Sequence, residues 1–193
     1  MNLEILYTAI YSYFLGSIPF GLILTKLFLN KDLRNIGSGN IGATNVLRAG
    51  NKSLGVFTLL LDTLKSYITI SITFIYFLDY IYLSAFLCFL GHIFPVWLKF
   101  KGGKGIAVFL GILFALSINL GIIFIICWGL ILFLTKFSSV SSIISTGIIF
   151  IYSFYSINSL ESEFFFIVLI IVIYTHRENI ARLKNKTEHK INL

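Results

Sequence analysis

Glycines and short polar residues alternate in one stretch of the chain, bounded by Arg34 and Arg48. Gly37, Gly39 and Gly42 let the backbone reach positive φ values. The polar side chains between the two arginines are those of Ser38, Asn40, Thr44 and Asn45. Exposed backbone amides beside an arginine bind anions, and a short helix opening here would add its positive end. A flexible linker is the alternative, but the close alternation with arginine favours an anion site.

A second glycine-rich stretch, residues 99–105, reads Lys-Phe-Lys-Gly-Gly-Lys-Gly. It is not a Walker A motif, because Leu98 stands where that pattern needs a glycine and Gly105 stands where a Ser or Thr would hold Mg²⁺. Glycine amides and one lysine can still hold a phosphate without a metal. Plain anchoring by positive charge is the alternative, but it would not need two adjacent glycines. We therefore expect residues 102–104 to bind phosphate.

Two further polar groups lie near the ends of apolar runs. Ser139 and Ser142 belong to a serine cluster that can cap a helix, and one or two of these hydroxyls can instead donate to a ligand. His176 and Asn179 are three residues apart and share a face on a helix. His176 ends an apolar run, where a titratable group can meet a substrate or can be only a boundary residue.

Three ionisable residues fall inside apolar segments. Asp62 and Lys65 are spaced for mutual pairing on one helix, and a structural pair is as reasonable as a role in ligand binding. His92 precedes Pro95 in a third segment. We expect His92 to support a neighbouring site, with a satisfied core histidine as the alternative.

The composition of the chain excludes most soluble classes. Of 193 residues, 58% are hydrophobic and 12% are charged, and the net charge is +7. Soluble domains average roughly 45–50% apolar and about 25% charged residues. A soluble enzyme, a nucleic-acid binder and a disordered chain are therefore disfavoured. Cys88 and Cys127 form no CxxC pattern, and no metal cluster is visible, so we expect no metal and no cofactor.

The distribution of positive charge predicts the membrane topology. All 15 Lys and Arg residues fall in residues 26–65, 99–104, 136 and 177–190. The positive-inside rule places these four stretches in the cytoplasm. Both ends of the uncharged run 105–135 are then cytoplasmic, so the run must cross twice, turning at residues 117–121. The alternative is one kinked helix over 105–135, which would leave Lys136 outside.

The sequence thus predicts an all-α integral membrane protein with about seven transmembrane helices in a single domain, 1–193. Glu4 stands where a signal peptide would carry basic residues, so the first helix is retained and the N-terminus is outside. The C-terminus and the active site are expected on the cytoplasmic face. The predicted helices cover 4–27, 53–78, 80–98, 105–117, 121–136, 140–159 and 161–176, with cytoplasmic loops 28–52, 99–104 and 136–140 and a cytoplasmic tail 177–193.

The ordered motifs resemble the bacterial acyl-phosphate:glycerol-3-phosphate acyltransferase family (PlsY type). They are Gly16-Ser17-Ile18-Pro19-Phe20-Gly21, the Gly-Ser-Gly-Asn-x-Gly-Ala-Thr-Asn block at 37–45, Asp62-x-x-Lys65, Gly91-His92-x-Phe94-Pro95, residues 100–105, Ser139, Ser142, His176-x-x-Asn179-Ile180-x-Arg182-Leu183, Glu188 and Lys190. The chain departs from the family pattern at Ser66 and Lys186, where glycine is usual, and at Lys136, where arginine is usual. Lysine keeps the charge but not the bidentate geometry.

The resemblance implies an activity. A fatty acyl group would pass from a long-chain acyl phosphate to the 1-hydroxyl of glycerol 3-phosphate, giving lysophosphatidic acid and inorganic phosphate in the first acylation step of phospholipid synthesis. The enzyme would lie in the bacterial cytoplasmic (inner) membrane as a multi-pass protein in contact with the lipid bilayer, without nucleic acid, metal, acyl-CoA or acyl-carrier protein. The alternative function is an anion or phosphate-ester membrane transporter.

The resemblance also implies roles for the polar residues. The expected catalytic residues are Ser38, Arg48, Lys104, His176 and Asn179. The expected substrate-binding residues are Asn40, Gly42, Thr44, Asn45, Gly102, Gly103, Ser139 and Ser142, with the backbone at 44–45 and 102–103 cradling the acyl phosphate. Asp62, Lys65 and His92 would support these residues. Either His176 or a phosphate oxygen of a substrate would act as the general base.

Overall fold

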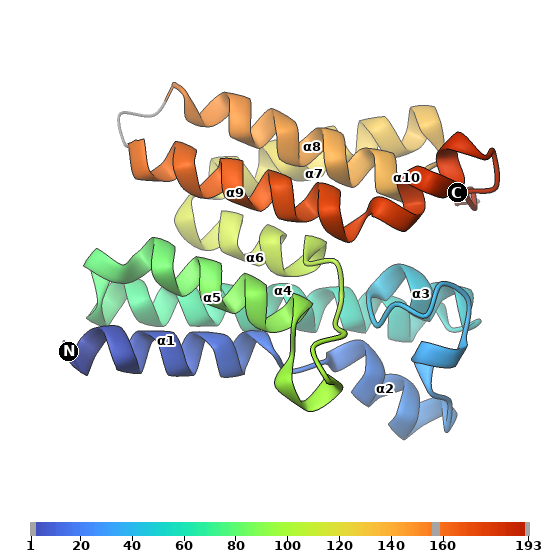
Figure 1. Ribbon diagram of the computed structural model, residues 1–193, viewed down its shortest axis with the longest axis horizontal. Helices are drawn as coiled ribbons and strands as arrows, with labels where there is room; N and C mark the ends of the chain where they lie inside the picture. Colours follow the sequence, from blue (N-terminus) through green and yellow to red (C-terminus); the bar gives the residue numbers. More distant parts are fainter. Residues whose placement is uncertain (1–2, 156–158, 192–193) are drawn as a thin grey trace. The chain divides into compact units, whose positions relative to one another are not determined.

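The computed structural model describes residues 3–155 and 159–191, and these residues contain helices and turns but no β-strand. The helices belong to two compact units, Met1–Leu116 and Ser117–Leu193 (Figure 1). Each unit is a small bundle of apolar helices.

The first unit contains four main helices that lie side by side (Figure 1). Its elements are α1 (Leu3–Gly16), α2 (Phe20–Leu29), η1 (Leu33–Asn35), α3 (Ala43–Arg48), α4 (Lys52–Tyr76), η2 (Leu78–Tyr80), α5 (Ile81–Ile93), η3 (Val96–Leu98) and α6 (Ile106–Leu116). Helix α1 packs against α5 and α4, and α4 packs along α6. The chain runs in one direction along α1 and α5 and in the opposite direction along α4 and α6 (Figure 1).

The first predicted helix, 4–27, is interrupted in the structure between Gly16 and Phe20. Pro19 causes the break, because it has no N–H group and disfavours helical geometry at Ile18. The carbonyl groups that the break frees are hydrogen-bonded by side chains from elsewhere in the unit. Trp97 Nε1 donates to Ser17 O at 2.7 Å, and Lys65 Nζ donates to Ile18 O at 2.6 Å.

The third predicted helix, 80–98, is shorter than expected because α5 ends at Ile93. Pro95 lacks the N–H that a continuing helix would use, and the chain turns instead through η3. Lys99 and Phe100 then adopt positive φ angles of 51° and 60°. The turn brings residues 102–103 back against the end of α5.

Helices α4 and α6 approach closely at Gly111. A Cβ atom at this position would lie 2.0 Å from Thr63 O and 2.2 Å from Ser66 Oγ, so only glycine fits. Ser66 Oγ donates to Val108 O at 2.8 Å. Ser66, one of the departures from the family pattern, thus joins α4 to α6.

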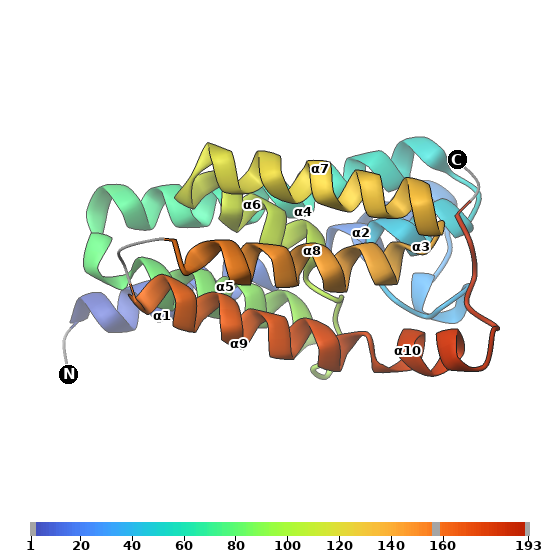
Figure 2. The same cartoon turned by 90° about the horizontal axis from the view of Figure 1, so that it is seen from above.

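The second unit contains α7 (Ile118–Thr135), α8 (Ser138–Ser153), α9 (Ser159–Thr175) and α10 (Arg177–Lys184). Helices α7, α8 and α9 lie side by side in Figure 2, and α10 bends away from α9 by 56°. The segment after α10 returns to the start of α8, where Ile191 N donates to Lys136 O at 2.9 Å. Part of the predicted helix 140–159, residues 156–158, and the last two residues of the predicted tail lie outside the described residues.

The break within the run 105–135 is shorter than the expected turn at 117–121. Ser117 alone is extended, with φ −161° and ψ 130°, and α7 begins at Ile118. Helix α8 likewise begins at Ser138, two residues before its predicted start at 140, and it ends at Ser153. Helix α9 starts at Ser159, before its predicted start at 161.

Four helical segments among the described residues are long and apolar enough to cross a membrane, and the bent pair α9–α10 makes a possible fifth. The four are Leu3–Leu29, Lys52–Tyr76, Leu78–Leu98 and Ile118–Thr135. Helices α6 and α8 are apolar but shorter. At 1.5 Å per residue, α6 with its 11 residues is roughly 16 Å long, about half of the hydrocarbon thickness.

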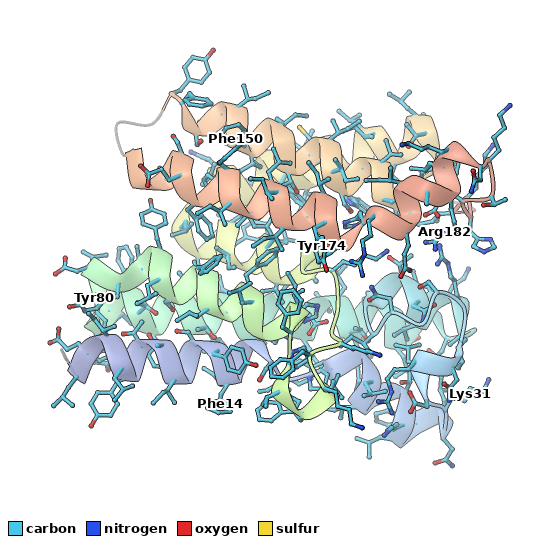
Figure 3. All side chains as sticks on the ribbon, in the orientation of Figure 1. Phe14, Lys31, Tyr80, Phe150, Tyr174 and Arg182 are labelled. Carbon is cyan, nitrogen blue, oxygen red and sulfur yellow. The ribbon has the colours of Figure 1, made fainter. Side chains whose placement is uncertain are left out.

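Charged residues separate to opposite ends of the first unit. Lys31, labelled in Figure 3, marks the end that carries the loop 30–51, which contains Lys31, Arg34 and Arg48. Asp79, next to Tyr80, lies at the opposite end, where α4 meets α5 (Figure 3). The turn after α5, which carries Lys99, Lys101 and Lys104, lies between these two ends, close to the break between α1 and α2 (Figure 1).

Candidate functional site

The loop between α2 and α4 is organised around the side chain of Asn45. Its Oδ1 accepts from Ser38 N at 3.0 Å, and its Nδ2 donates to Ile36 O and Asn40 O, both at 2.8 Å, and to Leu33 O at 3.2 Å. The residue is 2% exposed. Because both ends of this amide are used within the loop, Asn45 shapes the loop and its side chain is not available to a substrate.

Gly37 is required by this arrangement. Its φ is +56°, and a Cβ atom there would lie 2.4 Å from Asn45 Oδ1. Asn40 closes the next turn, since its Oδ1 accepts from Gly42 N at 2.9 Å. Gly42 is in turn the N-cap residue of α3. Asn40 and Gly42, expected to bind substrate, therefore contribute to loop geometry.

Three side chains on the same loop keep unused donors. The hydroxyls of Ser38 and Thr44 and the guanidinium of Arg48 make no hydrogen bond with any described residue. Ser38 and Thr44 are half-buried, and Arg48 is exposed. These three donors are positioned by the loop and remain free to bind an anion.

Arg34, at the other boundary of the loop, is engaged locally. Its Nη2 lies 2.6 Å from Asp32 Oδ2, and its Nε donates to the same carboxylate. The hydrogen bonds from Arg34 hold the pKa of Asp32 at about 2. The positive charge of Arg34 is thus neutralised by its neighbour, and Lys31 and Arg48 carry the remaining positive charges of this loop.

The amides of Gly102 and Gly103 are also occupied within the protein. Gly102 N donates to Ile93 O at 2.9 Å, and Gly103 N donates to His92 O at 3.0 Å. These two N–H groups therefore cannot cradle a phosphate, contrary to the expectation from sequence. The glycines instead permit close packing, since a Cβ atom on Gly102 would lie 2.1 Å from His92 O. Lys104, half-buried, follows directly on this turn.

Asp62, Lys65 and His92 form one buried cluster on α4 and α5. Lys65 Nζ lies 2.7 Å from Asp62 Oδ1 and 3.0 Å from His92 Nδ1. All three residues are at most 6% exposed. Lys65 also donates to Ile18 O, so the cluster ties α4 to α5 and to the break after α1.

In the second unit, the carboxylate of Glu188 gathers three polar side chains. Asn179 Nδ2 donates to Glu188 Oε1 at 2.5 Å, Ser139 Oγ donates to the same oxygen at 3.1 Å, and Arg182 Nε donates to Oε2 at 2.7 Å. Figure 3 labels Arg182 on α10. Partial burial would raise the pKa of Glu188, but these hydrogen bonds outweigh it and lower the pKa below its usual value.

His176 is buried at the junction of α9 and α10. Its Nδ1 lies 2.8 Å from Val172 O. A carbonyl oxygen only accepts, so Nδ1 carries the proton and Nε2 of the neutral ring is the basic nitrogen. This tautomer suits a group that takes a proton at Nε2.

Ser142 is held on the inner side of α8. Its Oγ donates to Ser138 O at 2.8 Å and accepts from Trp128 Nε1 at 3.1 Å. Ser139 and Ser142 are at most 4% exposed. The sequence analysis did not predict the contact from Trp128 to Ser142. It also did not predict that Glu188 would bind Ser139, Asn179 and Arg182, although Glu188 is one of the residues that carry the family resemblance.

The two lysines that depart from the family pattern in this unit occupy left-handed backbone positions. Lys136 has φ 64° at the end of α7, and Lys186 has φ 59° in the turn after α10. The usual glycine at the second position would adopt this conformation without a steric penalty. Lys136 also lies over the ring of Phe133, 4.8 Å from its centroid.

These features define a class: a helical integral membrane protein whose polar loops present hydroxyl, guanidinium and lysine donors suited to phosphate esters. The chain belongs to the glycerol-3-phosphate acyltransferase family, whose pattern it matches over residues 6–186. It is 52% identical over 188 residues to a glycerol-3-phosphate acyltransferase of Pelagibacter ubique, covering 97% of this chain and 98% of the relative. A relative of the same description from Ehrlichia ruminantium is 46% identical over 185 residues, covering 94% and 93%.

Solved structures agree with this assignment. The chain resembles the crystal structure of PlsY (YgiH), an integral membrane glycerol 3-phosphate acyltransferase, in its glycerol 3-phosphate form, with a TM-score of 0.92 and 38% identity over 97% of this chain and 96% of the other. A second crystal structure of that enzyme, in its lysophosphatidic acid form, gives a TM-score of 0.87 and 36% identity over 97% of this chain and 95% of the other. The chain is thus a glycerol-3-phosphate acyltransferase of the PlsY type.

Proposed function

We propose that this enzyme transfers a fatty acyl group from a long-chain acyl phosphate to the 1-hydroxyl of glycerol 3-phosphate. The observation that carries the proposal is the similarity, over nearly the whole chain, to an enzyme crystallised with glycerol 3-phosphate and with lysophosphatidic acid. Lysophosphatidic acid is the product of acylating glycerol 3-phosphate once. An acyl phosphate suits this reaction as donor, because its phosphate is already a good leaving group.

The reaction exchanges the mixed-anhydride bond of the acyl phosphate for an ester bond. The 1-hydroxyl oxygen of glycerol 3-phosphate attacks the acyl carbonyl carbon, and the bond from that carbon to the phosphate oxygen breaks. Inorganic phosphate leaves with the electron pair, and the hydroxyl proton goes to a base. The protein positions the reactants and stabilises the negative charge that develops on the carbonyl oxygen.

The first unit supplies the phosphate-binding donors in this proposal. Ser38, Thr44 and Arg48 have donors that the fold does not use, and Lys104 brings a further positive charge. Charge-assisted hydrogen bonds of this kind are the strong ones in phosphate recognition. Asn45 acts only through the loop, because its amide is fully engaged there.

Lys104→Ala is expected to abolish turnover while the protein still folds. The measurement is phosphate release by purified protein in detergent, given palmitoyl phosphate with and without glycerol 3-phosphate, with lysophosphatidic acid identified as product and palmitoyl-CoA run in parallel. The control is Lys101→Ala, since Lys101 is exposed and its loss should leave the rate within about twofold. Normal turnover by the Lys104 variant would remove this lysine from the site.

A folded wild-type protein that releases no phosphate with any donor would contradict the proposed reaction. Flux of phosphate esters into liposomes would then test the transporter alternative. Transporters hold their substrate near the bilayer midplane, often on paired broken helices, whereas the free donors of the first unit lie on its end loops. This difference favours the enzyme.

The general base is either His176 or a phosphate oxygen of the substrate. His176 is held with its proton on Nδ1 by Val172 O, so Nε2 can receive the hydroxyl proton. If His176 is the base, His176→Ala should lower kcat by about 10²–10⁴-fold. A variant with near-normal kcat would assign the proton to the substrate phosphate. The matched control is His189→Ala, at an exposed position in the tail.

We further propose that Asn179 and Ser142 orient reacting groups and that Ser139 binds substrate. Each is buried and held by a defined partner, Glu188 for the first two and Trp128 for the third. Rigid polar groups of this kind preserve reactant geometry. The enzyme would cross the bacterial cytoplasmic (inner) membrane seven times, N-terminus outside, with its basic loops and active site in the cytoplasm.

A further inference from the structure

The buried cluster on α4 and α5 fixes the chemical state of His92. The ammonium group of Lys65 has three N–H donors and no acceptor. Its three near neighbours are Ile18 O at 2.6 Å, Asp62 Oδ1 at 2.7 Å and His92 Nδ1 at 3.0 Å. Because Lys65 can only donate, Nδ1 of His92 must accept. The ring is therefore neutral and carries its proton on Nε2.

The Nε2–H group of His92 is an unused donor. The residue is 4% exposed, and its only hydrogen bond with a described residue is the one from Lys65 to Nδ1. Nε2 is not among the fully buried polar atoms that lack a partner, so this donor can reach an acceptor from outside the chain.

The position of Nε2 indicates where that acceptor would lie. A Cβ atom on Gly103 would lie 2.1 Å from Nε2, so this nitrogen sits directly against the Gly103 backbone. Gly103 is buried, and its own N–H donates to His92 O. A side chain at position 103 would block Nε2, and the absence of one leaves the donor accessible beside Lys104.

The surroundings select an anionic acceptor. Lys104 follows directly on this turn, while the charge of Asp62 is paired with Lys65. We propose that the Nε2–H of His92 donates a hydrogen bond to a phosphate oxygen bound beside Lys104, and that Asp62 and Lys65 hold the ring in the donating tautomer. This inference rests on the proposed function for the phosphate, which either acyl phosphate or glycerol 3-phosphate supplies.

Two substitutions of His92 distinguish phosphate binding by Nε2–H from the hydrogen bond that Nδ1 accepts from Lys65. In His92→Asn, the side-chain oxygen can replace Nδ1 as acceptor for Lys65, but nothing reaches the position of Nε2. In His92→Gln, the amide reaches the Nε2 position but gives Lys65 no acceptor near Nδ1. If Nε2–H binds phosphate, the Asn variant should bind inorganic phosphate about tenfold more weakly than wild type and the Gln variant should be less affected. The opposite order would overturn the proposal.

The binding experiment uses full-length protein labelled with ¹⁵N-histidine in detergent and inorganic phosphate as the probe. The Nε2–H proton of His92 should shift on phosphate addition, and the exposed His189 should not. This measurement on wild type needs no variant to fold, and an unmoved His92 signal at saturating phosphate overturns the proposal.

Steady-state kinetics identify which of the two substrates supplies the phosphate that His92 contacts. In His92→Asn, a raised KM for palmitoyl phosphate with an unchanged KM for glycerol 3-phosphate assigns the contact to the donor, and the reverse assigns it to the acceptor substrate. Both KM values unchanged would overturn the proposal. If wild type binds phosphate with the expected His92 shift but catalyses no acyl transfer, the proposed function fails while this inference stands.

Discussion

At the scale of single residues, polar side chains in this protein divide into those that build loops and those that stay free. Asn45 and Asn40 carry the side-chain amide that a substrate-binding asparagine would use. In this protein, however, the two amides close turns in the loop 30–51. Ser38 and Arg48, a few residues away, make no hydrogen bond with a described residue through their side chains. In the proposed function, substrate recognition by Ser38 and Arg48 depends on the loop geometry that Asn45 and Asn40 provide.

Asn45→Ala should therefore lower both stability and activity. The substitution leaves Ser38 N and the carbonyls of Ile36 and Asn40 without their partner, at a cost of about 2 kcal/mol or more. That loss corresponds to a fall in Tm of roughly 4–8 °C, and the KM for glycerol 3-phosphate should rise. Thermal unfolding in detergent and initial-rate kinetics measure the two effects.

Asn35→Ala is the matched control, because Asn35 is exposed in the same loop and its side chain makes no hydrogen bond with a described residue. It should leave Tm and KM near the wild-type values. An Asn45 variant as stable and active as this control would show that the loop holds its form without the amide.

At the scale of elements, the structure joins segments through a few polar contacts at places where helices stop. The break before α2 is stabilised by Trp97 and Lys65, which occupy the carbonyls that Pro19 leaves free. In the second unit, Glu188 joins the tail to α8 and α10 through Ser139, Asn179 and Arg182.

The Glu188 contacts predict a dependence of stability on pH. The pKa of Glu188 in the folded protein lies below its usual value of 4.5, so its contribution is complete above that pH and is lost as pH falls through the lowered value. Glu188→Gln should lower stability by about 1–2 kcal/mol at neutral pH. The difference in Tm from wild type should shrink on acidification below about pH 4.5.

The control is Glu178→Gln on α10, whose carboxylate lies 3.9 Å from Arg182 and is 68% exposed. Its effect should be small at every pH, as for other exposed ion pairs. A difference between wild type and Glu188→Gln that stays constant from neutral to acid pH would show that the carboxylate charge is unimportant.

At the scale of the whole molecule, the number of crossings decides on which side each loop lies. The seven crossings that we propose would place Asp79 and Glu163 outside and Lys101 and Lys184 in the cytoplasm. All four side chains are exposed in the structure, so cysteines introduced there can react. In intact cells, a membrane-impermeant maleimide should label cysteine variants of the two acidic positions, and those of the two lysines only after permeabilisation.

The same four variants test the single-helix alternative for residues 105–135. That topology has one crossing fewer, so Glu163→Cys would be protected and Lys184→Cys would be labelled in intact cells. The labelling of Asp79→Cys and Lys101→Cys would not change, which makes them internal controls. Cys88 is buried, and a variant with both native cysteines replaced by alanine provides the background.

The sequence alone determined the class of this protein and the motifs of its family. Hydrophobic runs and grouped charges can be read directly along the sequence. Insertion into lipid depends on the composition of each segment, and the positive-inside bias depends on the Lys and Arg content of each loop. Helices occur close to most of the predicted ranges, and the largest differences follow Pro19 and Pro95, whose local effect outweighs hydrophobicity.

The hydrogen-bond partners of the polar residues within those motifs become visible only in the tertiary structure. Asn45 and Ser38 look alike as candidate ligands in sequence, and so do Gly102 and Gly103 as anion-binding amides. The structure shows that Asn45 and both glycine amides are used by the protein itself, whereas His92 keeps an unpartnered donor. The physical reason is that a hydrogen bond needs two groups, and the second group here comes from a distant part of the chain.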